Sequence, residues 1–161
     1  DHARAVQIGG PSGRCIGHDE FDRKICYDDL STGGAMIVIG PQRDLLKIVF
    51  NFARFFEEES CGWCIPCRVG NRLLKNKLEK ILAGNGTRLD LDELEEWGKI
   101  ISSTARCGLG TTSPNPILTT LTNFRHIYEE RLKEDEYLTG FDLTEAVAEA
   151  CEQTGRSPHF E

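Results

Sequence analysis

The chain has 161 residues, of which 39% are hydrophobic and 28% charged, and its net charge is −7. This mixture is typical of a folded domain and excludes a disordered segment. The acidic balance, without a basic stripe, argues against binding of nucleic acid or of an anionic membrane. We find no export signal and no apolar stretch long enough to cross a bilayer, so we expect a cytoplasmic protein without direct membrane insertion.

The first 41 residues are expected to form strands and turns. Residues 5–8 and 36–39 are predicted strands, because short apolar runs there are bounded by glycine and proline. The acidic segment 18–22 between them is predicted to be a loop.

A helical period begins at Asp44. Apolar residues from Leu45 to Phe56 predict a first helix that is buried on most sides. A second helix is predicted to start around Pro66 and to end at Gly84.

Two more helices and a short terminal one complete the prediction. Asp90, with Glu93 three residues later, is the expected N-cap of the third, which ends before Cys107. The fourth follows Pro116 and continues past residue 124, and a last short helix is predicted over residues 142–152. The fold class is therefore mainly α: a four-helix bundle over residues 42–135, preceded by a β-rich segment 1–41 and followed by a tail 136–161.

Cysteine spacing carries the strongest functional signal. Seven cysteines in a chain without an export signal favour metal or redox use over disulfides. Four of them combine a tight group of three, spaced by two residues, with a distant fourth: Cys61, Cys64, Cys67 and Cys107. Four thiolates are the ligand set of a [4Fe–4S] cluster. The other three have no ligand spacing: Cys15, Cys26 and Cys151.

Neighbouring residues are expected to tune such a cluster in opposite directions. The start of the second helix and the charge of Arg68 favour the more negative, reduced state. Three apolar neighbours are expected to bury the cluster and so lower its potential: Trp63, Ile65 and Leu109. Gly62, Gly108 and Gly110 are expected to provide steric room. The sequence does not decide which influence on the potential is larger.

Two other metal sites match the spacing less well. Zinc sites with four cysteines usually take their ligands as two separate Cys-x-x-Cys pairs, which this pattern matches poorly. A plant-type [2Fe–2S] site needs a four-residue gap between its first two cysteines, and that gap is absent here.

The cysteine runs 59–70 and 107–116 resemble the flavoprotein subunit of NADH dehydrogenases of the respiratory complex I type. Within this family the two runs most resemble the diaphorase large subunit of NAD-reducing hydrogenases. NAD-dependent formate dehydrogenases carry a related subunit. Run 6–13 resembles the end of that family's β-grasp, soluble-ligand-binding-like domain, and run 30–35 also resembles the family. The tail 141–156 resembles the hydrogenase-linked branch, so the resemblance covers nearly the whole chain.

The resemblance implies that Cys61, Cys64, Cys67 and Cys107 ligate one [4Fe–4S] cluster. It also implies that this cluster relays electrons between FMN and Fe–S clusters of partner subunits. In that family the FMN and NAD(H) sites lie upstream, in a glycine-rich domain that this sequence does not contain. We therefore assign no FMN, NAD(H) or catalytic residue here, and the non-methionine start suggests part of a longer subunit.

The resulting hypothesis is an electron-transfer segment of an NAD(H)-dependent oxidoreductase, of the NAD-reducing hydrogenase type. Its expected partners are the upstream FMN/NADH-binding domain and other Fe–S subunits. Alternatives are the related subunit of respiratory NADH:quinone oxidoreductase or of formate dehydrogenase, a structural metal-binding assembly module, and a free-standing ferredoxin-like carrier.

Overall fold

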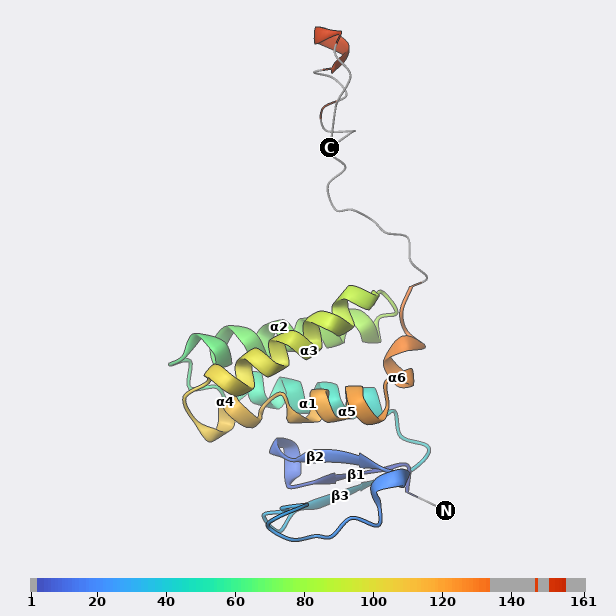
Figure 1. Cartoon of the computed structure of the whole chain (residues 1–161), viewed down its shortest axis with the longest axis vertical. Helices are drawn as coiled ribbons and strands as arrows, with labels where there is room; N and C mark the ends of the chain where they lie inside the picture. Colours follow the sequence, from blue (N-terminus) through green and yellow to red (C-terminus); the bar gives the residue numbers. More distant parts are fainter. Residues whose placement is uncertain (1–2, 134–146, 148–150, 156–161) are drawn as a thin grey trace.

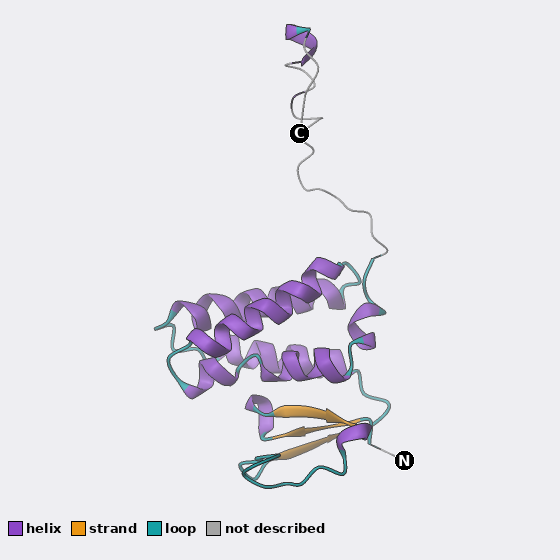
Figure 2. Cartoon of the chain, in the orientation of Figure 1, coloured by secondary structure: helices purple, strands orange, loops and turns teal. Residues whose placement is uncertain are grey.

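A computed structural model describes residues 3–133, 147 and 151–155. The chain forms three layers (Figure 1): helices α2 and α3, then α1 and α5, then a small sheet. Figure 2 shows that helices predominate and that strands are confined to the N-terminal part. This confirms the predicted mainly α class with a small β segment in front.

The sheet has three antiparallel strands in the order β2-β1-β3. Strands β1 (Ala5–Ile8) and β3 (Met36–Ile39) were predicted. Strand β2 (Arg14–Gly17) was missed, because its four residues include only two apolar side chains and show no clear alternation. Two 3₁₀ turns flank it, η1 (Gly10–Ser12) and η2 (His18–Glu20), so the predicted loop begins with a helical turn.

Each face of the sheet contributes to a different apolar cluster. Ala5, Cys15 and Ile39 belong to the main core that the helices form. On the opposite face, side chains of β1 and β2 pack with Leu30, which lies in the long loop before β3. The sheet is thus anchored to the helices by alternate residues of its strands.

Six helices lie between residues 45 and 129. They are α1 (Leu45–Glu58), α2 (Ile65–Leu82), α3 (Arg88–Thr104), α4 (Gly108–Thr112), α5 (Asn115–Asn123) and α6 (His126–Glu129). Their core includes Leu46, Val49, Leu74, Leu78, Leu94, Ile101, Ile117, Leu121 and Tyr128. No helix within the described residues is long and apolar enough to cross a membrane.

The first helix is buried or half-buried on most sides, as expected, and exposes a single stripe. Its residues Lys47, Asn51 and Arg54 are exposed, and so is Phe55. The polar side chains form a stripe toward solvent, and the buried apolar residues occupy the opposite side. Helix α1 is therefore amphipathic.

The predicted fourth helix is divided into α5 and α6. The break falls at Phe124, whose φ of −138° and ψ of 37° are not helical. Its ring packs on Gly17 of β2, where an added Cβ would lie 3.1 Å from the ring. Packing onto the sheet thus overrides the helical pattern. Most of the predicted terminal helix 142–152 lies outside the described residues. The described residues in and directly after this range, 147 and 151–154, are helical.

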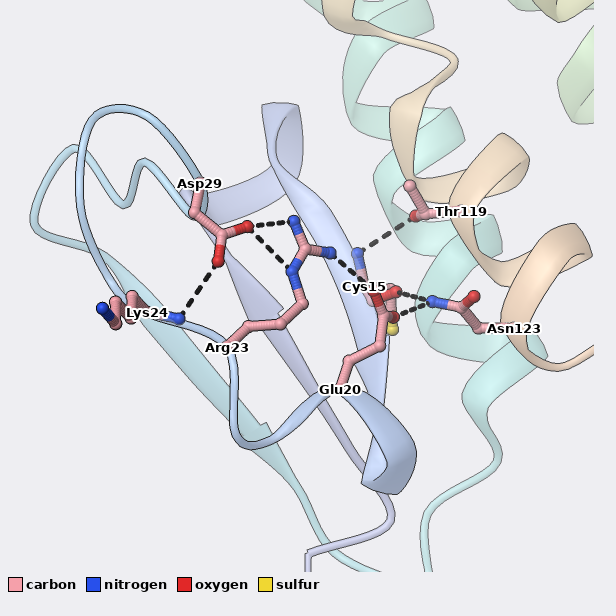
Figure 3. Close-up of polar contacts among 7 residues, drawn as sticks. All are labelled: Cys15, Glu20, Arg23, Lys24, Asp29, Thr119 and Asn123. Atoms are coloured by element: carbon pink, nitrogen blue, oxygen red, sulfur yellow. Dashed lines mark hydrogen bonds and ion pairs between the residues drawn. The ribbon is translucent and has the colours of Figure 1, made fainter.

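Side chains of α5 cover the outer edge of β2 (Figure 3). The Cys15 backbone N–H donates to Thr119 Oγ1 at 3.0 Å, and Asn123 Nδ2 donates to the Cys15 carbonyl at 3.1 Å. Asn123 also contacts Glu20, which forms an ion pair of 2.5 Å with Arg23 in the following loop. One turn of α5 therefore supplies hydrogen-bond partners for the backbone N–H and carbonyl of Cys15, which lie on the outer edge of the sheet.

Helix α3 begins at a different cap from the predicted one. Its N-cap is Thr87, whose Oγ1 accepts the backbone N–H of Asp90 at 3.3 Å. The Asp90 carboxylate in turn accepts the Thr87 backbone N–H at 2.9 Å, which completes a capping box. Asp90 is therefore the third helical residue rather than the cap.

Asp90 is also the centre of a charge cluster between α2 and α3. Its side chain is only 1% exposed, and its oxygens lie 2.5 Å from Lys77 Nζ and 2.6 Å from Lys80 Nζ. Burial alone would raise the pKa of Asp90, but hydrogen bonds from Lys77, Lys80 and Thr87 outweigh it and lower this pKa to about 2.

Replacing Asp90 by Asn is expected to lower the free energy of unfolding by about 2 kcal/mol at pH 7. Because the folded pKa lies below the unfolded one, the stabilisation is complete above about pH 4 and is lost as the pH falls toward 2. Urea unfolding at pH 7, 4 and 2.5 measures this. Asp92→Asn, an exposed position of the same helix, is the control and should change stability little. A pH-independent loss in Asp90→Asn would contradict the assignment.

Candidate metal centre

The four predicted ligands lie where α2 and α4 begin. Cys61 follows the end of α1, Cys64 is the N-cap of α2, Cys67 lies in its first turn, and Cys107 is the N-cap of α4. Figure 1 shows these two helix starts at the same end of the bundle, and α2 contacts α4. The fold therefore brings the distant cysteine to the group of three.

The loop that carries the first cysteines is shaped by local contacts. Gly62 has a φ of +75°, a left-handed conformation that favours glycine. Its N–H donates to Ser60 Oγ at 3.3 Å, and Arg68 Nη1 donates to its carbonyl at 3.1 Å. Pro66 occupies the first turn of α2, as predicted. The Arg68 guanidinium is thereby held against the cysteine loop, which agrees with its expected position beside the ligands.

The four thiols differ in their environment. Cys67 is buried, with 4% exposure, and Cys64 is half-buried, whereas Cys61 and Cys107 are exposed. The Cys67 sulfur lies 3.3 Å from Ser60 Oγ and 3.4 Å from Asn71 Nδ2. One sulfur of the set thus points into the polar interior of the bundle, while two face its surface.

Cys64 is the thiol that the backbone favours as a thiolate. The N–H of Arg106, and then the N–H of Cys67, donate to its sulfur and lower the pKa of Cys64 below its ordinary value. The thiolate is the form that binds metals.

Cys15 shows the opposite behaviour. Burial raises the pKa of Cys15 to about 12, and the negative charge of Glu20 acts in the same direction. This thiol lies in β2, in the core that the sheet shares with the helices. It stays protonated, which agrees with the absence of ligand spacing around it.

Helix α4, which the sequence analysis did not predict, has a glycine at its closest contact with α2. A Cβ added at Gly110 would lie 2.7 Å from Ala105 Cβ and 3.2 Å from Cys67 Cβ. A Cβ at Gly108 would meet nothing within 4 Å. Gly110 therefore gives room for α4 to approach Ala105 and Cys67, whereas no described atom lies close to Gly108.

Two of the three apolar neighbours expected to bury the cluster are exposed on the described chain. Trp63 is 79% exposed and Ile65 is 65% exposed, while Leu109 is half-buried. The buried side of α2 near its start is formed by Cys67, Gly70 and Asn71, so Ile65 at the first position faces away from the bundle. Hydrophobicity alone does not reveal this orientation.

The sulfurs are not arranged for one metal ion. Within the part of the chain that the structure describes, no three His, Cys, Asp or Glu side chains are grouped closely enough to hold one. A closed zinc site needs four ligands at about 2.0–2.3 Å from a single ion. The thiolates of a [4Fe–4S] cluster bind separate iron corners and are held farther apart. Four thiolates are soft donors that fit the irons of such a cluster by their chemistry.

Comparison with known proteins identifies the family. The family model for the NADH-ubiquinone oxidoreductase-F iron-sulfur binding region matches residues 47–131, which include all four predicted ligands. The chain belongs to this family. It is 49% identical, over 90% of its length, to the NAD-reducing hydrogenase HoxS subunit alpha of Cupriavidus necator, of which it covers 25%.

Other members of the family are similar over much of the chain. The NADP-reducing hydrogenase subunit HndC of Solidesulfovibrio fructosivorans is 41% identical over 78% of the chain and 27% of its own length. A subunit of the NADH-quinone oxidoreductase of Rhizobium meliloti is 31% identical over 94% of the chain and 36% of its own length. A crystal structure of an NAD⁺-reducing [NiFe]-hydrogenase matches with a TM-score of 0.80 at 35% identity, over 99% of this chain and 29% of the other. The chain thus spans about a quarter to a third of these relatives.

A test of the contact between α2 and α4 follows from the two glycines. Gly110→Ala is expected to push α4 away from Cys67 and to lower the iron content of the purified protein at least twofold, because overpacked contacts are relieved by backbone shifts. Gly108→Ala adds the same methyl group in open space and serves as the matched control. The measurement is the iron content per chain of both variants after anaerobic purification. Equal iron contents in the two variants would contradict the role of Gly110.

Proposed function

We propose that Cys61, Cys64, Cys67 and Cys107 hold a [4Fe–4S] cluster and that the chain relays electrons within an NAD(H)-dependent oxidoreductase. The observation that carries the proposal is the meeting of the α2 and α4 starts: α4 contacts α2, and a Cβ added at Gly110 would lie only 3.2 Å from Cys67 Cβ. When bound, such a cluster accepts and releases single electrons. The match to an iron-sulfur binding region supports this assignment.

The residues around the cysteines serve to hold negative charge. Arg68 brings a positive side chain to the cysteine loop, and backbone N–H groups donate to the sulfur of Cys64. Helix α2 directs the positive end of its dipole toward the same place. These groups favour thiolate ligation and compensate the charge that an added electron brings.

The type of complex is proposed from the relatives. The identity of 49% to a subunit of an NAD-reducing hydrogenase, against 31% to a subunit of NADH-quinone oxidoreductase, supports the hydrogenase diaphorase over the respiratory enzyme. In this proposal FMN and NAD(H) bind to another part of the subunit, and other Fe–S subunits exchange electrons with this segment. The enzyme activity belongs to that whole assembly.

We also propose that residues 1–41 are the end of a β-grasp domain, followed by the cluster-binding bundle 42–135 and a tail 136–161. The three-stranded antiparallel sheet supports the first assignment. So does strand β3, because Met36, Ile37 and Val38 are exposed on this edge strand, which is expected of a strand that another part of the same domain covers.

Anaerobic iron and acid-labile sulfide analysis, with an EPR spectrum after dithionite reduction, tests the proposed cluster. We expect about four irons and four sulfides per chain and an S = 1/2 signal in the reduced protein. Zinc without sulfide would instead support the structural assembly module. A cluster that dithionite or NADH-derived electrons do not reduce would also contradict the relay function.

Removing one ligand provides a more specific test. Cys64→Ala is expected to lose the cluster or convert it to a species with fewer irons, because it removes one of the four thiolates that hold the four irons. Cys15→Ala removes a buried thiol of the sheet and should leave iron content and EPR spectrum unchanged. Cys26→Ala, at an exposed position, is a second control. Full iron content in Cys64→Ala would exclude this residue as a ligand.

A further inference from the structure

Asn71 is a buried polar residue on the apolar side of α2. It is 2% exposed and lies one turn after Cys67, where the helix otherwise buries Leu74, Leu78 and Ile81. Burying an amide side chain costs free energy unless its hydrogen bonds are satisfied. The contacts of Asn71 therefore indicate what the residue does.

These contacts define the orientation of the amide. Its Nδ2 lies 3.4 Å from the Phe56 carbonyl oxygen and 3.4 Å from Cys67 Sγ. Its Oδ1 accepts a hydrogen bond of 2.7 Å from Ser113 Oγ. Because a carbonyl oxygen can only accept, the NH₂ group must be on the side of Phe56, which is also the side of the sulfur. Ser113, itself 2% exposed, holds the oxygen on the other side.

The sulfur that receives this donor is the most enclosed of the four predicted ligands. Cys67 is buried, and Ser60 Oγ lies 3.3 Å from the same atom. Ser60 Oγ already accepts the Gly62 N–H, so its own proton is free to be donated to a thiolate. Hydrogen bonds to ligand sulfurs stabilise the more negative, reduced state of a cluster and so raise its reduction potential.

We propose that Asn71 is a positioning residue that orients Cys67 and raises the reduction potential of the cluster, with Ser113 holding its amide in place. The proposal rests on the cluster assignment made above. It gives a reason for a buried amide inside an apolar stripe. It also links the cluster loop to the end of α1 through Phe56 and to the residue after α4 through Ser113.

The test is a redox titration of the purified protein, followed by EPR, in three single variants and one double variant. Asn71→Leu keeps the approximate size and removes the donor. We expect full iron content and a potential lowered by about 59 mV, which is a tenfold change in the equilibrium of a one-electron couple. Asn76→Leu makes the same change at an exposed position of α2 and should leave the potential unchanged.

Ser113→Ala distinguishes an effect of the Asn71 hydrogen bond on the reduction potential from an effect of Asn71 on packing. It leaves the amide in place and removes the hydroxyl that orients it, so we expect a smaller lowering of the potential. If Ser113 acts through Asn71, the double variant should have the potential of Asn71→Leu alone. Additive shifts would mean that Ser113 acts instead through its second contact, with the Gly110 carbonyl at 2.9 Å.

Each outcome of these titrations either supports or overturns the proposed role of Asn71. An unchanged potential in Asn71→Leu with full iron content overturns the proposal. If Asn71→Leu does not retain its cluster, a lowered potential in Ser113→Ala supports the proposal and an unchanged one overturns it. Loss of the cluster from both variants would make Asn71 a folding residue only. A wild-type protein without iron and sulfide would instead overturn the proposed function, so the two failures are distinguishable.

Discussion

The position of α3 along α2 is the constraint on which the site depends. One loop supplies three cysteines, but the fourth arrives only after the chain has run the length of α3 and turned into α4. Two glycines allow the helices to approach closely. A Cβ at Gly70 would lie 2.5 Å from Ile101 Cδ1, and one at Gly98 would lie 2.8 Å from Leu118 Cδ2. Close packing of α3 on α2 and α5 thus determines where the start of α4, which carries Cys107, meets the start of α2.

The unequal environments of the four thiols suit a relay. Cys67 is enclosed by the bundle, while Cys61 and Cys107 are exposed at its end. A centre held in this way has one side in a rigid interior and another at a surface that a second redox centre can approach.

Sequence reasoning reached the features that depend on spacing and on helical period. The cysteine pattern, the extent of α2 and the strands of residues 5–8 and 36–39 are of this kind. It missed what depends on tertiary contacts. Helix α4 has five residues and no apolar period, and the break at Phe124 comes from packing on Gly17. The α3 cap was misplaced because Asp90 satisfies both the pattern of a cap and that of its partner in a capping box.

The same corrections change the expected balance of the cluster potential. From the sequence, the helix dipole and Arg68 are expected to raise the potential, and burial by three apolar neighbours is expected to lower it. Trp63 and Ile65 are both exposed, so they are no longer counted among the residues that lower the potential by burial. The described contacts add donors to the first: the Arg106 N–H at Cys64, and Asn71 Nδ2 at Cys67. Hydrogen bonds, charge and dipole then act in one direction, and the remaining opposition is the half-buried Leu109 and the burial of Cys67 itself. We therefore expect this chain to favour the reduced state of its cluster more than an apolar, donor-free pocket would.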